Sequence, residues 1–281
     1  MAGAQFDPEA VRAFEQARWE RAAAAYPTTF AGATRPFIEP LLDAARVGCG
    51  DRLLDLACGP GFVASAAHAR GAEARGMDFS PAMLAVARAR EATVRFDQGD
   101  AETVPYPDAT FDAVVSNFGI HHVPRPLFAL REAYRVLRHG GRVAFSFWAE
   151  PSENIAWKLV LDAVSRYGDR AASSAPEPGG GFATGGQCAS ALEAAGFAEC
   201  ATRLVRARWQ HRDAQALVDA LQAGTARMAA VLEAQQPTAK VAIVANIASC
   251  AAHYRNSAGI DLPIAAVIAS GVRRRKPADS T

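Results

Sequence analysis

The stretch from Arg52 to Phe62, RLLDLACGPGF, decides the fold of this chain. Its three leucines between residues 53 and 56 form a short apolar run, as a strand buried on both faces requires. Residues 57–61 are small or turn-forming, and apolar spacing resumes at Phe62, which predicts a helix. A strand, a tight glycine turn and a helix bring backbone N–H groups and a helix N-terminus close to a ligand. The stretch therefore predicts a nucleotide or nucleoside site.

The spacing of the glycines narrows the choice of nucleotide. A dinucleotide fingerprint, G-x-G-x-x-G, would fall on Ala57, Gly59 and Phe62, and only Gly59 fits it. A phosphate-binding loop would need Lys-Ser or Lys-Thr after Gly61, and neither follows. Asp55, Gly59 and Gly61 instead resemble the first motif of class I S-adenosylmethionine-dependent methyltransferases, D-x-G-x-G-x-G, with Ala57 in place of the first glycine.

The next two predicted strands also end in acidic residues. Asp78 ends a strand at 72–78, where a carboxylate can accept hydrogen bonds from both hydroxyls of a ribose. Phe79 and Met83 are placed to enclose an adenine ring, and the segment GMDFSPAML resembles the second methyltransferase motif. A short strand at 94–96 leads to Asp100, where the resemblance implies an acid that meets the adenine amino group. The resemblance assigns these residues to the cofactor: Tyr26, Ala57, Gly59, Gly61, Asp78, Phe79, Met83, Asp100, Ala101, Glu102, Asn117 and Phe118.

The order of the predicted elements defines the fold class. Strands at 111–117 and 142–148 flank a helix at 125–137, so five strands alternate with helices and predict a doubly wound parallel sheet. Two more strands, at 201–209 and 263–271, complete an α/β, Rossmann-like, seven-stranded and mostly parallel sheet with helices on both faces.

The chain is expected to divide near residue 150. Residues 1–150 would form the S-adenosylmethionine-binding core with an N-terminal helical cover, beginning with a helix from Pro8 to Ala25. Residues 151–281 would hold the remaining strands and a helical cap over the substrate. Residues 176–186 are rich in glycine and proline and predict a loop, and the basic run 273–276 predicts a solvated tail.

The predicted mouth of the sheet carries candidate catalytic and substrate residues. His121 and His122 follow the fourth strand, and histidine titrates in the range that a general base needs. In the alternative interpretation, these histidines only bond the backbone or line the cofactor pocket. The candidates for contact with the substrate are Trp19, Phe30, Arg35 and Trp148.

The composition excludes several classes of partner. Thirty Lys and Arg residues against 29 Asp and Glu leave a net charge of +1, too small a field to grip nucleic acid. The five cysteines contain no C-x-x-C pair, so we expect neither a metal site nor a disulfide framework. The N-terminus lacks a signal-peptide pattern, and no apolar stretch is long enough to span a membrane. We expect a cytoplasmic protein, monomeric or homodimeric, without membrane or nucleic-acid partners.

The resemblance covers residues 26–150 and is specific to the small-molecule branch near the ubiquinone and menaquinone methylases. It implies methyl transfer from S-adenosyl-L-methionine, with S-adenosyl-L-homocysteine as product. The acceptor would be a small, flat or apolar metabolite such as a quinone, polyketide or heterocycle of secondary metabolism, methylated on O, N or C. Two alternatives remain: an NAD(P)-dependent oxidoreductase, which Ala57 and Phe62 disfavour, and a non-catalytic S-adenosylmethionine-binding protein.

Overall fold

The computed structural model describes residues 6–176, 178–179, 182 and 184–274. Within these ranges the strands form one sheet in the order β3-β2-β1-β4-β5-β8-β6. The parallel strands are β1 (Arg52–Leu56), β2 (Glu73–Asp78), β3 (Arg95–Gln98), β4 (Phe111–Asn117) and β5 (Leu137–Trp148). Strand β8 (Gly259–Arg273) runs antiparallel to both β5 and β6 (Phe197–His211). The predicted mostly parallel α/β sheet is confirmed, and a two-residue strand β7 (Arg255–Asn256), which pairs with β8, adds an eighth strand to it.

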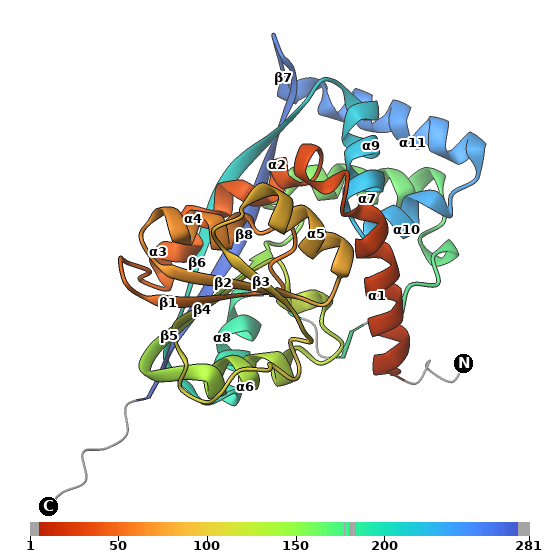
Figure 1. Cartoon of the computed structure of the whole chain (residues 1–281). Helices are drawn as coiled ribbons and strands as arrows, with labels where there is room; N and C mark the ends of the chain where they lie inside the picture. Colours follow the sequence, from red (N-terminus) through yellow and green to blue (C-terminus); the bar gives the residue numbers. More distant parts are fainter. Residues whose placement is uncertain (1–5, 177, 180–181, 183, 275–281) are drawn as a thin grey trace, which may run out of the picture.

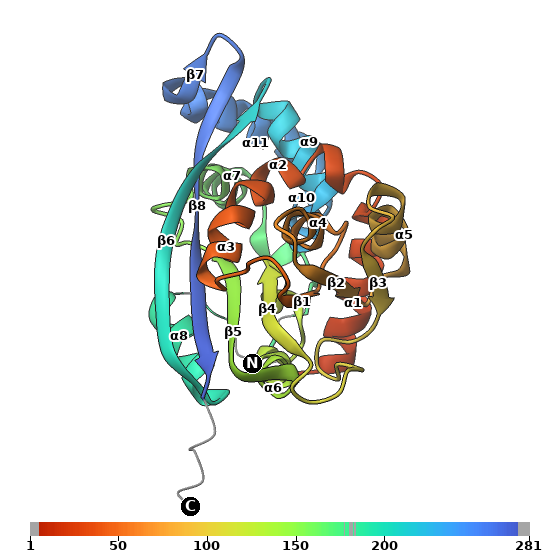
Figure 2. The same cartoon turned by 60° about the vertical axis from the view of Figure 1, so that its left-hand side comes forward.

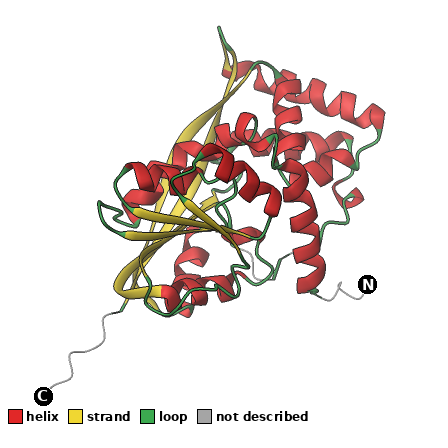
Figure 3. Cartoon of the chain, viewed as in Figure 1, coloured by secondary structure: helices red, strands yellow, loops and turns green. Residues whose placement is uncertain are grey.

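Helices cover both faces of the sheet because alternate residues of the buried strands point in opposite directions. Leu53 of β1 packs in one apolar cluster with helices α3 (Ile38–Ala44) and α4 (Phe62–Ala69). Its neighbour Leu54 packs in another cluster, on the side of α6 (Pro126–Val136) and α8 (Gly185–Ala194). Figures 1 and 3 show α3, α4 and α5 (Pro81–Arg90) on one side of the sheet and α6 and α8 on the other.

A layer of helices packs against the C-terminal end of β6 and the N-terminal end of β8, which pair with each other (Figure 2). It contains α7 (Ile155–Tyr167), α9 (Ala214–Gly224), α10 (Arg227–Glu233) and α11 (Pro237–Cys250). The helix expected from residue 213 to 233 is broken between α9 and α10, where Thr225 turns its hydroxyl back to the carbonyl of Leu221 and also accepts from the N–H of Ala229. The apolar cluster beneath this layer also includes Phe30, Phe37 and Phe118. The division of the chain at residue 150 stays a prediction.

The N-terminal helix α1 (Pro8–Ala22) lies at the open end of the parallel strands, between α5 and α10 (Figure 1). Its start is fixed by the Asp7 side chain, which accepts from the N–H groups of Glu9 and Ala10. Short turns of helix follow: η1 (Tyr26–Thr28), α2 (Ala31–Thr34) and η2 (Arg35–Phe37). In the described part of the chain, no helix is long and apolar enough to cross a membrane. The predicted loop 176–186 and basic run 273–276 lie partly outside the described residues.

Candidate active site

A cavity of about 620 Å³ opens at the carboxyl ends of the parallel strands. The strand order reverses between β1 and β4, and ligands of open α/β sheets bind at such a reversal. Most of the predicted site residues line this cavity: Trp19, Tyr26, Phe30, Ala57, Gly59, Asp78, Phe79, Met83, Asp100, Ala101, Asn117, Phe118, His121, His122 and Trp148. Gly61, Glu102 and Arg35 do not lie on its wall.

Gly59 and Gly61 in the glycine turn have different roles, which the sequence does not distinguish. Ala57, Gly59 and Gly61 all adopt left-handed backbone conformations, with φ of 57°, 50° and 77°. A methyl group added to Gly59 would meet only Met83 Sδ, 4.0 Å away, so this residue leaves room for a ligand. One added to Gly61 would lie 2.6 Å from a ring carbon of Phe96, so Gly61 is required by packing behind the turn.

Glu102 and Arg35, the other two predicted site residues that do not line the cavity, contact other side chains. Glu102 is 5% exposed and accepts from the backbone N–H of Arg125 at 2.7 Å and from its Nε at 2.8 Å. Arg12 from α1 also approaches it, with Nη2 3.2 Å from Oε2. The Arg35 guanidinium is exposed and lies over the ring of Phe62, 5.1 Å from its centroid.

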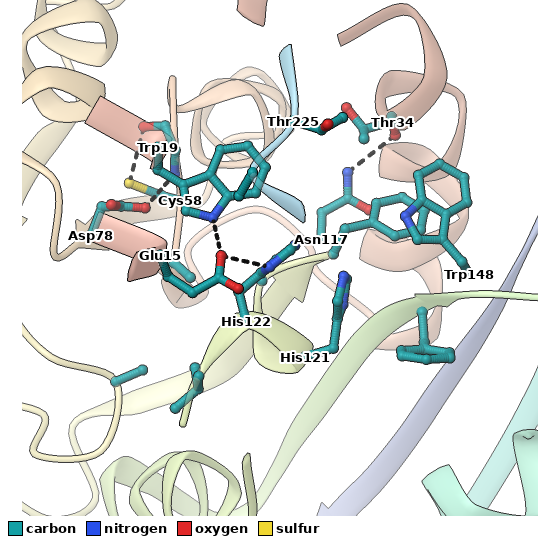
Figure 4. Close-up of a pocket in the computed structure, with 18 of the residues that line it drawn as sticks. Glu15, Trp19, Thr34, Cys58, Asp78, Asn117, His121, His122, Trp148 and Thr225 are labelled. Carbon is teal, nitrogen blue, oxygen red and sulfur yellow. Dashed lines mark hydrogen bonds and ion pairs between the residues drawn. The ribbon is translucent and has the colours of Figure 1, made fainter. Parts of the chain in front are cut away.

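Asp78 is held rigidly at the end of β2 (Figure 4). Its Oδ2 accepts from the N–H of Gly59 at 2.8 Å, and its Oδ1 accepts from the N–H of Ser80 at 2.9 Å. Burial raises the pKa of Asp78 to about 6, against the effect of these hydrogen bonds. The N–H of Phe79 also bonds to this carboxylate, which has about four acceptor sites, so Asp78 can still accept from a hydroxyl of a ligand.

Asp55 also lines the cavity, and the resemblance did not assign it to the cofactor although it belongs to the first motif. Its Oδ2 accepts from the N–H of Ala64 at 3.0 Å, and its buried Oδ1 has no hydrogen-bond partner. Burial, together with the nearby charge of Asp78, raises the pKa of Asp55 to about 8. Two buried acids in one cavity fit a ligand that carries positive charge and hydrogen-bond donors, as S-adenosylmethionine does.

Aromatic rings form the wall on the cap side. Phe118 stacks on Trp148 with centroids 4.0 Å apart and planes 22° apart, and Trp157 lies 4.4 Å from Trp148 at 32°. No ring contact joins Phe118 to Trp157, so these rings cover opposite faces of Trp148. Phe30 meets the same indole edge-on at 6.0 Å. Trp148 therefore presents ring edge, and no open face, to the cavity.

Glu15 is the least expected member of the site. It lies on α1, is 1% exposed, and its Oε2 is 3.0 Å from Nδ1 of His122. Trp19 Nε1 donates to the same oxygen at 3.0 Å, and Arg227 Nε from α10 donates to Oε1 at 2.7 Å. Burial opposes ionisation, but His122 and Arg227 together lower the pKa of Glu15 below its usual value. Figure 4 shows the carboxylate between Trp19 and His122.

The neighbouring His121 has a different environment. Its ring lies 4.1 Å from that of His122 and meets Phe147 edge-on at 5.2 Å. Burial, with the adjacent charges of His122 and Arg227, lowers the pKa of His121 well below its usual value. It is therefore neutral at physiological pH, and its buried Nδ1, like that of His122, has no partner in hydrogen-bond geometry.

Sequence patterns did not indicate Arg12, Glu15 or Arg227, because charged residues on amphipathic helices usually face solvent. Asn117 has a bracing role in addition to its place on the wall: its amide donates to the carbonyl of Thr34 at 3.1 Å and accepts from Ser146 at 2.6 Å. Among the described residues, no group of three or more His, Cys, Asp or Glu side chains could hold a metal ion.

Comparisons with known proteins agree with this geometry. Residues 54–145 match a family model described as a methyltransferase domain. The demethylmenaquinone methyltransferase of Paenarthrobacter aurescens is 36% identical over 120 residues, which are 43% of this chain and 47% of that protein. The malonyl-[acyl-carrier protein] O-methyltransferase of Serratia marcescens is 37% identical over 134 residues, 48% of this chain and 52% of that protein. The chain thus spans about half the length of these curated relatives.

A solved structure extends the likeness to most of the chain. The YcgJ protein of Bacillus subtilis superimposes with a TM-score of 0.58 at 18% identity, covering 86% of this chain and 100% of that one. The fold is therefore that of the class I methyltransferases, and the chain resembles the S-adenosylmethionine-dependent members of that class. Within the class, its methyltransferase domain resembles those of the quinone methylases.

Proposed function

We propose that this protein is a methyltransferase that uses S-adenosylmethionine to methylate a small, neutral and flat acceptor. The observation that carries the proposal is one cavity in which a glycine turn, the strand-end acid Asp78 and the buried acid Asp55 face a wall of aromatic rings. The methyltransferase domain at residues 54–145 supports it. The expected cytoplasmic location, the oligomeric state and the role in secondary metabolism stay predictions.

The cofactor half of the cavity would hold S-adenosylmethionine through residues at four strand ends. Asp78 would accept from the ribose hydroxyls, and Phe79 and Met83 would enclose the adenine. Asp55 would accept from the amino group of the methionine part, which gives its unpartnered oxygen a donor. When bound, the cofactor supplies a methyl group that its sulfonium already activates.

The chain's own residues then have to orient the acceptor, exclude water and take up a proton. The aromatic wall performs the first two tasks, because it is apolar and lies beneath α1 and the cap helices. His121 and His122 both line the cavity, with His122 against Trp19 of α1 and His121 against Phe147, so an acceptor held in the cavity could contact them. They are the candidate bases.

The wall also favours one class of acceptor. A cationic amine would need open ring faces, but both faces of Trp148 are covered by Phe118 and Trp157. The edge of Trp148 can instead contact the face of a flat acceptor ring, as in an edge-to-face aromatic pair. A quinone-like acceptor agrees with this, and one relative bears the name demethylmenaquinone methyltransferase. Which atom is methylated depends on the acceptor.

The test is calorimetric titration with S-adenosylmethionine, S-adenosylhomocysteine and NADH in parallel. We expect dissociation constants in the micromolar range for the two sulfur ligands and no binding of NADH. Binding of NADH alone would overturn the proposal in favour of an oxidoreductase. Formation of S-adenosylhomocysteine from the cofactor and a panel of reduced naphthoquinones then tests the acceptor class. Tight cofactor binding without any turnover would favour a non-catalytic binding protein.

A further inference from the structure

We propose that Glu15 is a positioning residue that holds His122 with its proton on Nδ1, so that Nε2 is the base that takes the acceptor's proton. This inference rests on the proposed methyltransferase function, and it distinguishes between the two adjacent histidines. It also assigns a role to the N-terminal helix beyond covering the cavity.

The Glu15 carboxylate is held in a single orientation. Trp19 Nε1 donates to Oε2 and Arg227 Nε donates to Oε1, at 3.0 and 2.7 Å. With a partner on each oxygen and only 1% of the residue exposed, the carboxylate cannot turn away. Its Oε2 is thus fixed 3.0 Å from Nδ1 of His122.

The charge of this carboxylate decides what it requires of His122. Arg227, whose charge is permanent and whose Nε donates to Oε1, favours the ionised form of Glu15 despite its burial, and His122 adds to this effect only when its imidazole is protonated. Nδ1 and Oε2 are 3.0 Å apart but are not aligned as a hydrogen bond in this structure; because an ionised carboxylate only accepts hydrogen bonds, the contact is favourable only with a proton on Nδ1. A neutral imidazole has one such proton, and its other nitrogen then presents a lone pair. Glu15 therefore selects the tautomer in which Nε2 of His122 is basic.

His122 and His121 differ in their surroundings. His122 lines the cavity, and no described residue hydrogen-bonds to its Nε2. His121 has no carboxylate beside it, and the groups that act on it, His122 and Arg227, both disfavour its charged form. In the reaction, the bond between the acceptor atom and its proton breaks, its electron pair stays on the acceptor, and the proton bonds to Nε2. Glu15 remains ionised and stabilises the resulting imidazolium.

Because Glu15 belongs to α1, the base is complete only when this helix is in place. The same helix carries Arg12, whose Nε donates to Asp100, another residue that lines the cavity. The helix that covers the cavity therefore also carries the carboxylate that faces His122.

The test uses the full-length protein labelled with 15N-histidine and saturated with S-adenosylhomocysteine, because the acceptor is not needed. The chain has six histidines, and the His122→Gln variant assigns the signals of His122. Two-bond 1H–15N spectra then report which nitrogen carries the proton. We expect Nδ1 of His122 to be protonated and Nε2 to be bare in the wild type. Protonated Nε2 in the wild type would overturn the proposal without any variant of Glu15.

The variant Glu15→Gln removes the charge and keeps the size of the side chain. We expect it to lose the selection, so that His122 shows a mixture of tautomers or the Nε2-protonated form. The matched control is Glu233→Gln, which removes another acid that pairs with α1, through Arg18, and lies outside the cavity. The control is expected to leave His122 unchanged. An unchanged tautomer in Glu15→Gln would mean that the carboxylate only stabilises the fold.

A measurement of S-adenosylhomocysteine affinity distinguishes a failure of this inference from a failure of the proposed function. Because Glu15 also holds α1 over the cavity, we expect Glu15→Gln to bind S-adenosylhomocysteine up to about fivefold more weakly, so the tautomer of His122 is read at saturating ligand. A wild type that fails to bind S-adenosylhomocysteine would refute the proposed function. A wild type that binds it, with Nδ1 of His122 bare, would refute only the role of Glu15.

Discussion

The Nε of Arg12 lies 3.0 Å from Oδ2 of Asp100, which joins the first helix of the chain to the loop that follows the third strand. The same guanidinium reaches Glu102, with 3.2 Å between Nη2 and Oε2. Asp100, which the resemblance assigns to the adenine amino group, is thus hydrogen-bonded to Arg12 of α1. Ion pairs from Arg12 to Asp100 and from Glu15 to His122, one helical turn apart on α1, hold this helix over the cavity.

Replacement of Arg12 by Gln is expected to weaken binding of S-adenosylhomocysteine about fivefold, near 1 kcal/mol, because a partly buried ion pair that holds α1 would be lost. Calorimetry measures the affinity, and stopped-flow fluorescence should assign the loss to faster release. The control Arg21→Gln changes a mostly exposed α1 residue 3.6 Å from Glu233 and should have no effect. Tighter binding by the Arg12 variant would show instead that Arg12 competes with the ligand for Asp100.

Substitution of Asp78 by Ala is expected to weaken cofactor binding by about 2 kcal/mol or more, if its carboxylate accepts from both ribose hydroxyls. Titration with S-adenosylhomocysteine measures the change. Asp97→Asn is the control, because this acid pairs with Arg95 and Tyr106 outside the cavity. Equal affinities for the wild type and the Asp78 variant would refute the assignment of the ribose site.

Asp55 should make the ligand-free protein more stable at low pH. Burial raises its pKa in the folded state to about 8, far above the value of about 3.9 in an unfolded chain, so folding takes up a proton between these limits. The stability linked to that proton is fully present below pH ~4 and is lost as the pH rises through about 8.

The near-isosteric variant Asp55→Asn removes this titration. At pH ~9 its free energy of unfolding should exceed that of the wild type by about 2 kcal/mol, and the difference should narrow as the pH falls towards ~5. Urea unfolding at a series of pH values provides the measurement. The same variant should bind S-adenosylmethionine more weakly, because a charged acceptor for the amino group is gone. A stability difference that does not vary with pH would count against a buried, titrating Asp55.

Gly61 should prove essential to stability for a steric reason. In Gly61→Ala the new methyl group would lie 2.6 Å from the Phe96 ring, on a backbone whose φ is 77°. We expect a loss of about 2–3 kcal/mol in the free energy of unfolding, from overpacking and backbone strain together. Gly50→Ala is a matched control, since Gly50 has a φ of 81° and nothing within 4 Å of the added carbon. Equal losses in the two variants would leave no role for the contact with Phe96.

Glu102 should matter for the fold more than for the cofactor. Replacing it with Gln breaks a buried pair with Arg125 and Arg12, so we expect a loss of about 2–3 kcal/mol in stability. Affinity for S-adenosylhomocysteine should stay within about threefold of the wild type. The exposed pair of Asp108 with Arg135 provides the control, where Asp108→Asn should cost less than about 1 kcal/mol. A large fall in affinity would instead support the cofactor role first predicted for Glu102.

The alternation of strands and helices, the doubly wound sheet and the cavity's location could be predicted because their signals are local, whereas some element boundaries could not: α1 ends at Ala22, and β5 begins at Leu137. A three-leucine strand, a turn with glycines at residues 59 and 61, and an acid at position 78 each depend on a few neighbouring residues. The fourth strand occurs at 111–117, as expected from its own apolar run. Ligands of such a sheet bind beyond its carboxyl ends, so the strand-end residues came together as the order of elements implied.

The tertiary structure alone separated residues that the motif treats alike. Gly59 and Gly61 share a left-handed backbone, but only the latter faces a side chain, Phe96, that leaves no room for a Cβ. Glu102 follows Asp100 in the same motif, and the guanidinium of Arg125 turns it away from the cavity wall.

The sequence by itself determined the fold class, the strand-end acids and the glycine turn, because backbone preferences and apolar periodicity act over a few residues. Only the tertiary structure decided that Glu15 meets His122 and Arg227. Helical periodicity tells which residues of α1 share a face, but it contains no information on what lies opposite that face. The partners of Glu15 come from a turn after β4 and from a cap helix, and they converge only when the sheet has brought these segments to one end of the molecule.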